Sequence, residues 1–124
     1  MSKAFVLDMI KKLSSLNGID ISLLIKKNGD IIASSGNDGY TSLEPFGIMS
    51  ATIFGAANTA NDHLNKETPE IIILKSSDGD TIIKEVGNDF ILVIRSEIAD
   101  ETERYIKNMD KAIENLEDNI GGRL

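Results

Sequence analysis

The sequence of 124 residues contains no cysteine and no tryptophan, and its only histidine is His63. Without cysteine the chain has no disulfide, no thiolate metal site and no thiol nucleophile. One histidine alone also leaves a transition-metal site short of its usual nitrogen and sulfur ligands. We therefore expect no metal and no cofactor. We expect His63 to be a solvated side chain near a helix C-terminus, where a partly cationic ring suits the helix dipole.

Positive charge is scarce and scattered along the chain. There are 13 lysine and arginine residues against 20 aspartate and glutamate residues, which gives a net charge of −7. Such a balance disfavours attraction to nucleic acid or to anionic lipid. The N-terminal stretch MSKAFVLDMIKKL holds no apolar run long enough for a signal peptide or a membrane span. We expect a cytoplasmic protein, and the length fits a single domain over residues 1–124.

Motifs for catalysis are also missing. The phosphate-binding pattern GxxxxGK[ST] is absent, so the chain should not hydrolyse a nucleotide by itself. Asp78 and Asp80 come nearest to a carboxylate pair for acid and base catalysis, but they flank Gly79 in a stretch typical of a hairpin turn. The sequence therefore predicts no catalytic residue, and we expect the protein not to be an enzyme.

The sequence predicts an α/β chain of the α+β type. Apolar residues three and four apart predict helices, and short apolar runs between turn residues predict strands, with Asn28-Gly29 typical of a tight hairpin. The predicted order is α-ββ-α-βββ-α. Its elements cover residues 2–16, 21–27, 31–35, 44–64, 70–76, 81–86, 89–96 and 100–119. We expect the first and last helices on one face of a sheet and the middle helix on the other.

Two of the predicted strands are apolar without alternation. Residues 70–76 (EIIILKS) and 89–96 (DFILVIRS) each hold four or more consecutive apolar residues, which predicts burial on both faces. An apolar strand at the edge of a sheet invites pairing with another chain. If 70–76 is an edge strand, we expect something to cover it.

The middle helix contains two glycines, each of which costs about 1 kcal/mol relative to alanine in a helix interior. We assign one face to the protein's own sheet: Phe46, Met49, Ile53, Ala57, Ala60 and Leu64. A neighbouring face carries small and polar residues: Gly47, Ala51, Phe54, Gly55, Asn58 and Asp62. Small residues four apart allow close approach of a second helix, which would compensate the glycines. The alternative is that Gly47 costs little in the first turn and Gly55 accommodates a strand.

These patterns together resemble the roadblock family, which includes the dynein light chain roadblock proteins and Mgl-type polarity regulators of bacteria. The most specific pieces are the junction Leu16-Asn17-Gly18-Ile19 and the turn Lys27-Asn28-Gly29-Asp30, and the resemblance runs from about Phe5 to Leu116. It implies a profilin-like, five-stranded antiparallel sheet in the order 2-1-5-4-3. It also implies dimers, with itself or with a roadblock paralogue, and a role as a scaffold or regulator that binds small Ras-like GTPases.

Carried over residue by residue, the resemblance implies a dimer interface on the middle helix and the third strand: Gly47, Ala51, Gly55, Asn58, Ile71, Ile73 and Lys75. It implies partner-binding residues near the paired helices, of which Phe54 would be an exposed aromatic anchor: Phe54, Asp62 and His63. A small-molecule sensor of the PAS or profilin-like kind is the alternative function. Only six aromatic residues in the whole chain disfavour such a pocket.

Overall fold

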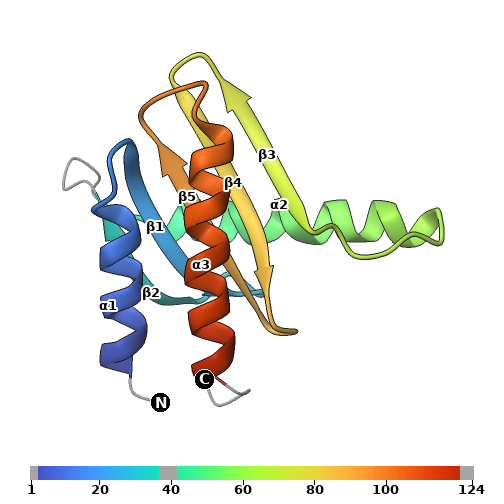
Figure 1. Ribbon diagram of the computed structural model, residues 1–124. Helices are drawn as coiled ribbons and strands as arrows, with labels where there is room; N and C mark the ends of the chain where they lie inside the picture. The colour runs from blue at the N-terminus through green and yellow to red at the C-terminus, as the bar shows by residue number, and fades with distance from the viewer. Residues whose placement is uncertain (1–2, 37–41, 121–124) are drawn as a thin grey trace.

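A computed structural model describes residues 3–36 and 42–120 and contains the eight predicted elements in the predicted order (Figure 1). Their bounds are α1 Lys3–Ser14, β1 Ile19–Lys26, β2 Ile31–Gly36, α2 Glu44–His63, β3 Ile71–Ser76, β4 Gly79–Val86, β5 Phe90–Ser96 and α3 Thr102–Ile120. The predicted hairpin between β1 and β2 is also confirmed. Gly29 has a φ of 99°, and the backbone N–H of Asp30 donates to Asn28 Oδ1 at 2.9 Å.

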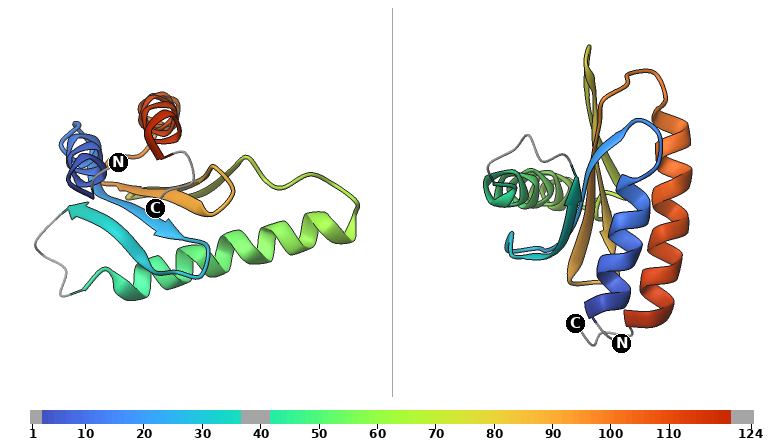
Figure 2. Two further views of the ribbon diagram at one scale, coloured as in Figure 1. Left: turned by 90° about the horizontal axis from the view of Figure 1, so that it is seen from below. Right: turned by 90° about the vertical axis from the view of Figure 1, so that its left-hand side faces the viewer.

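The five strands form one antiparallel sheet in the order β2-β1-β5-β4-β3, as predicted. Figure 2 shows α1 and α3 on one face of this sheet and α2 on the other. Each face has its own apolar cluster: Leu24, Leu92 and Ile94 belong to the side of α1 and α3, while Leu23 and Val93 belong to the side of α2. The layer arrangement expected from the element order is therefore confirmed.

Burial on both faces is confirmed for β5 and wrong for β3. Residues Phe90 to Ile94 of β5 are all buried, because β5 lies in the middle of the sheet between β1 and β4. Strand β3 lies at the edge and pairs only with β4, so Ile73 and Leu74 remain exposed. The sheet therefore ends in an apolar strand whose outer edge pairs with no described part of the chain.

The predicted orientation of α2 is wrong. The residues that α2 buries are Gly47, Ser50, Ala51 and Phe54. Met49, Ala60 and Leu64, which we assigned to the sheet, are exposed, while Phe46 and Ile53 are only partly buried at the margin of the apolar cluster. The small residues face the protein's own sheet because they allow close approach there. A Cβ on Gly47 would lie 3.3 Å from Cγ1 of Ile31 in β2.

The two halves of α2 have different surroundings. Its first half crosses the sheet on the side opposite α1 and α3, and its second half extends past β3 into open space (Figures 1 and 2). Phe54 is the last buried residue of the helix, and the following residues are half-buried or exposed. The edge strand and the projecting end of α2 thus lie on the same side of the molecule.

Candidate functional site

The exposed apolar side chains of the described residues gather mainly on α2 and β3. Five of the seven large ones lie on these elements or directly after α2, and they are Ile48, Met49, Leu64, Ile73 and Leu74. Leu64, Ile73 and Leu74 lie on the side of the molecule where α2 projects past β3, while Ile48 and Met49 lie in the first turns of α2. Clustered exposed apolar side chains are typical of an interaction surface. We call the surface formed by β3 and the second half of α2 the β3–α2 surface.

Three predicted interface residues lie on the β3–α2 surface with space around them. Within the described residues, and apart from its own helix backbone, no heavy atom lies within 4 Å of a Cβ built on Gly55. Asn58 is half-buried, and its side-chain oxygen is shielded from solvent without a hydrogen-bond partner in the described chain. Ile73 is exposed on β3.

Three other predicted residues lie elsewhere. Gly47 and Ala51 are buried against the protein's own sheet, so their assignment to a dimer interface is wrong. Phe54 is only 3% exposed, packs among apolar side chains of the sheet and lies with its ring centroid 5.4 Å from Lys27 Nζ. The prediction that Phe54 is an exposed anchor is therefore wrong as well.

Asp62 and His63 occupy the exposed end of α2. On β3, alternate residues face opposite sides of the sheet. Ile71 packs against the apolar cluster under α1 and α3, so Ile73 and Lys75 lean toward the same side. A partner that pairs with the β3 edge would meet these side chains at its margin.

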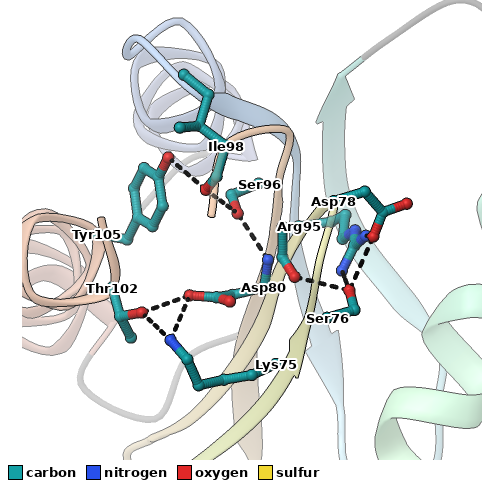
Figure 3. Close-up of polar contacts among 10 residues, drawn as sticks. Lys75, Ser76, Asp78, Asp80, Arg95, Ser96, Ile98, Thr102 and Tyr105 are labelled. Carbon is teal, nitrogen blue, oxygen red and sulfur yellow. Dashed lines mark hydrogen bonds and ion pairs between the residues drawn. The ribbon is translucent and has the colours of Figure 1, made fainter. Parts of the chain in front are cut away.

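Lys75 reaches from β3 into a polar cluster at the start of α3 (Figure 3). Its ammonium group donates to Thr102 Oγ1 at 2.7 Å and lies 3.5 Å from Oδ2 of Asp80. Thr102 in turn donates to the same carboxylate oxygen of Asp80. Asp80 is completely buried, so its charge is compensated by Lys75 and Thr102 and not by water. The cluster joins the edge strand to α3 through β4.

Asp80 has two further features. Its backbone N–H donates to Ser96 Oγ at 2.8 Å, which ties the start of β4 to the end of β5. Its second carboxylate oxygen, Oδ1, is buried without a partner in the described chain. Sequence reasoning missed this cluster, since Lys75 and Thr102 are 27 residues apart and only the folded sheet brings them together.

Asp78, the other predicted carboxylate, lies on the opposite side of the same turn and is exposed. Arg95 donates to its carboxylate at 2.9 Å, and Ser76 donates to it at the same distance. The hydrogen bonds from Ser76 and Arg95, together with the Arg95 charge, hold the pKa of Asp78 below its usual value. Asp78 and Asp80 thus bond to different partners, and neither is arranged as a free acid or base beside the other.

Metal sites and membrane-spanning helices were also sought in the described part of the chain. No group of three or more histidine, cysteine, aspartate or glutamate side chains there is arranged to hold a metal ion. None of its helices combines the length and apolar character needed to cross a membrane.

Comparisons with known proteins agree with this architecture. The Roadblock/LC7 domain family profile matches residues 5–96. The solved structure of Myxococcus xanthus MglB superposes with a TM-score of 0.91 at 14% identity, covering 99% of this chain and 92% of that one. A search of curated proteins finds no match.

Two more distant structures show how widely the fold is shared. A Roadblock/LC7 domain from Streptomyces avermitilis gives a TM-score of 0.80 at 9% identity, covering 89% of this chain and 92% of that one. Schizosaccharomyces pombe profilin gives a TM-score of 0.64 at 15% identity, covering 99% of this chain and 100% of that one. At these identities the likeness establishes the fold alone, which is profilin-like as predicted.

Proposed function

Because the chain belongs to the Roadblock/LC7 domain family, we propose that it is a dimeric, non-catalytic regulator that binds small Ras-like GTPases. The observation that carries the proposal is the β3–α2 surface, in which an unpaired apolar edge strand lies beside a helix half that the protein's own sheet does not cover. An open apolar edge strand invites pairing with another chain, and the uncovered half of α2 lies beside it.

A symmetric dimer would pair the open edge of β3 and cover the second half of α2 at once. In a two-fold arrangement the same patch of each copy faces itself, so β3 would pair antiparallel with its copy and continue the sheet. The second half of α2 would then lie over the partner. Gly55 would allow close approach there, and the half-buried Asn58 one turn later would lie at the same contact. The proposed interface therefore comprises Gly55, Asn58, Ile71, Ile73 and Lys75.

The GTPase would bind near the exposed end of α2, where we place Asp62 and His63 in contact with it. With Phe54 buried, the large exposed apolar side chain at this end of α2 is Leu64, while Ile48 and Met49 are exposed in its first turns. Regulation needs no catalytic side chain here, because a bound protein can reorganise the GTPase's own catalytic loops. The MglB relatives, which the resemblance associates with GTPase control, support this role by analogy.

The test uses purified protein and the Ras-like GTPases of its own organism, each loaded with GDP or with a non-hydrolysable GTP analogue. We expect saturable binding in interferometry with a preference for one nucleotide state. The matched variants are Met49→Glu on the outer side of α2 and Leu64→Glu at its end. Failure of every GTPase to bind in either state would contradict the proposal. Binding without any change in hydrolysis rate would leave a scaffold and exclude an activator.

A further inference from the structure

A second set of exposed apolar side chains lies outside the β3–α2 surface. Leu16 follows α1 and Ile98 precedes α3, and they are 36% and 41% exposed. Both belong to the end of the molecule where Gly18 lies, since a Cβ on Gly18 would be 3.3 Å from Ile98 Cδ1. Because α1 and α3 cover the opposite face of the sheet from α2, self-association through β3 and α2 does not explain this set.

Leu16 also lines a groove of about 170 Å³ between α1 and α3, which run side by side in Figures 1 and 2. We call it the α1–α3 groove. Met9 and Leu13 of α1 contribute apolar surface together with Leu16, and α3 contributes an alanine and two asparagines. A protein cavity of about 150 Å³ accommodates benzene. The groove therefore has room for one large apolar side chain.

The charged residues that line the α1–α3 groove have one sign. Lys12 stands on its α1 wall and Lys111 on its α3 wall, and none of the described residues that line it is acidic. This is unusual in a chain with 20 acidic residues. Lys12 has a partial partner in Asp8, at 3.4 Å on the exposed side of α1. Lys111 has no carboxylate within ion-pair distance among the described residues.

On α3 the neighbours of Lys111 carry both signs, since Lys107 lies four residues before it and Glu114 three residues after it. Lys107 lies one turn before Lys111, and like charges four residues apart destabilise a helix slightly. Glu103, which the sequence places four residues before Lys107, forms no ion pair with it. An acidic ligand would relieve this repulsion. Lys12 and Lys111 therefore present two ammonium groups to an acidic ligand at the rim of the groove.

We propose that the α1–α3 groove is a second docking site, which binds a short acidic segment of another protein. The segment places an apolar side chain between the two helices and carboxylates beside Lys12 and Lys111. A peptide suits the groove better than a phosphate polymer, because only a peptide can place an apolar side chain against Met9, Leu13 and Leu16. The site lies on the other face of the sheet from α2 and is independent of the proposed GTPase contact.

The test is a titration of isotope-labelled protein, followed by NMR, with synthetic twelve-residue peptides. These probes carry leucine, phenylalanine or methionine at the centre and aspartate or glutamate around it. We expect saturable shifts confined to residues 9–16 and 104–115, weakened by salt. A peptide with lysine in place of the acids, and one with alanine at the centre, serve as controls and should not saturate.

Variants distinguish binding in the groove from a general attraction between charges. Lys111→Glu should weaken binding roughly tenfold, since it replaces an attraction by a repulsion at the rim. Leu16→Ser should weaken it through the apolar contact. Lys26→Glu makes the same charge change at an exposed site on β1 and should have no effect. All three positions are exposed, so the variants should keep the wild-type melting temperature.

Three results would overturn the proposal. One is that no acidic probe gives saturable shifts, and another is that the shifts lie outside the α1–α3 groove. The third is that the groove is filled by a second copy of the chain, which light scattering would reveal as assembly beyond a dimer that Lys111→Glu abolishes. A negative GTPase experiment leaves this test unchanged, because the two surfaces lie on opposite faces.

Discussion

The two glycines of α2 show how differently the halves of one helix are used. Gly47 lies where the helix crosses the sheet, and a side chain there would press on Ile31. Gly55 lies where the helix leaves the sheet, with open space around it. The first glycine is explained by packing inside the protein. The second still costs helix stability without any compensation in one copy of the chain, which is why we assign it to an interface.

The largest loss of stability should come from the part of α2 that packs on the sheet. Phe54→Ala removes a buried ring from the apolar cluster between α2 and the sheet, and such truncations cost about 3–5 kcal/mol of unfolding free energy. Urea unfolding measures the loss. Met49→Ala, on the exposed side of the same helix half, should change stability by less than about 0.5 kcal/mol. Equal losses in the two variants would contradict the orientation of α2.

Gly47→Leu should have the next largest effect, because it forces a long side chain against Ile31 and the backbone of Gly29. Overpacking of this kind costs about 1–3 kcal/mol. Thermal unfolding at low protein concentration measures the effect on one chain. A variant as stable as the wild type would mean that α2 does not approach the sheet as closely as described.

Gly55→Ala should instead raise the stability of the folded chain when the protein is dilute enough to be monomeric. In the exposed interior of a helix, alanine is favoured over glycine by roughly 0.5–1 kcal/mol, and nothing in the described chain obstructs the added Cβ. The gain should disappear at concentrations where the chain associates, since the methyl group then meets the partner. A stability gain that is independent of concentration would remove Gly55 from the proposed interface.

The smallest effect is expected in the hairpin that follows β3. Hydrogen bonds from Ser76 and Arg95 lower the pKa of Asp78 from its usual 3.8, so the folded state favours the ionised carboxylate. Its stabilising contribution is present at neutral pH and is lost as the pH falls below that value. Asp78→Asn should therefore be slightly less stable than the wild type at pH 7, and the two should converge in acid. A difference in stability between Asp78→Asn and the wild type that grows in acid would refute this account.

The fold was largely predictable from the sequence, and the orientation of α2 was not. Turn residues and apolar periods are local signals, so Asn28-Gly29 and the eight elements could be placed without tertiary information. A stripe of residues four apart turns by about 40° at each step, because a helix has 3.6 residues per turn. Gly55 therefore points about 80° away from Gly47, and the stripe cannot share one neighbour along its whole length.

The polar cluster around Asp80 could not be predicted for a different reason. It combines residues from β3, β4 and α3, and no short-range pattern relates Lys75 to Thr102. The burial of β3 was predicted wrongly from its local pattern, although the strand order implied by the family resemblance already placed this strand at the edge. Four consecutive apolar residues predicted burial of β3 on both faces, yet its place in the sheet leaves it unpaired on one side. Only the strand order distinguishes β3 from β5.

The solution mass of the native chain tests the central claim most directly, which is that the β3–α2 surface joins two copies. Light scattering should give twice the chain mass of 13.5 kDa for the wild type and for Ala4→Leu, an exposed control on α1. Gly55→Leu should give a single chain mass with an unchanged circular dichroism spectrum. A wild type that stays at 13.5 kDa at high concentration would contradict the account.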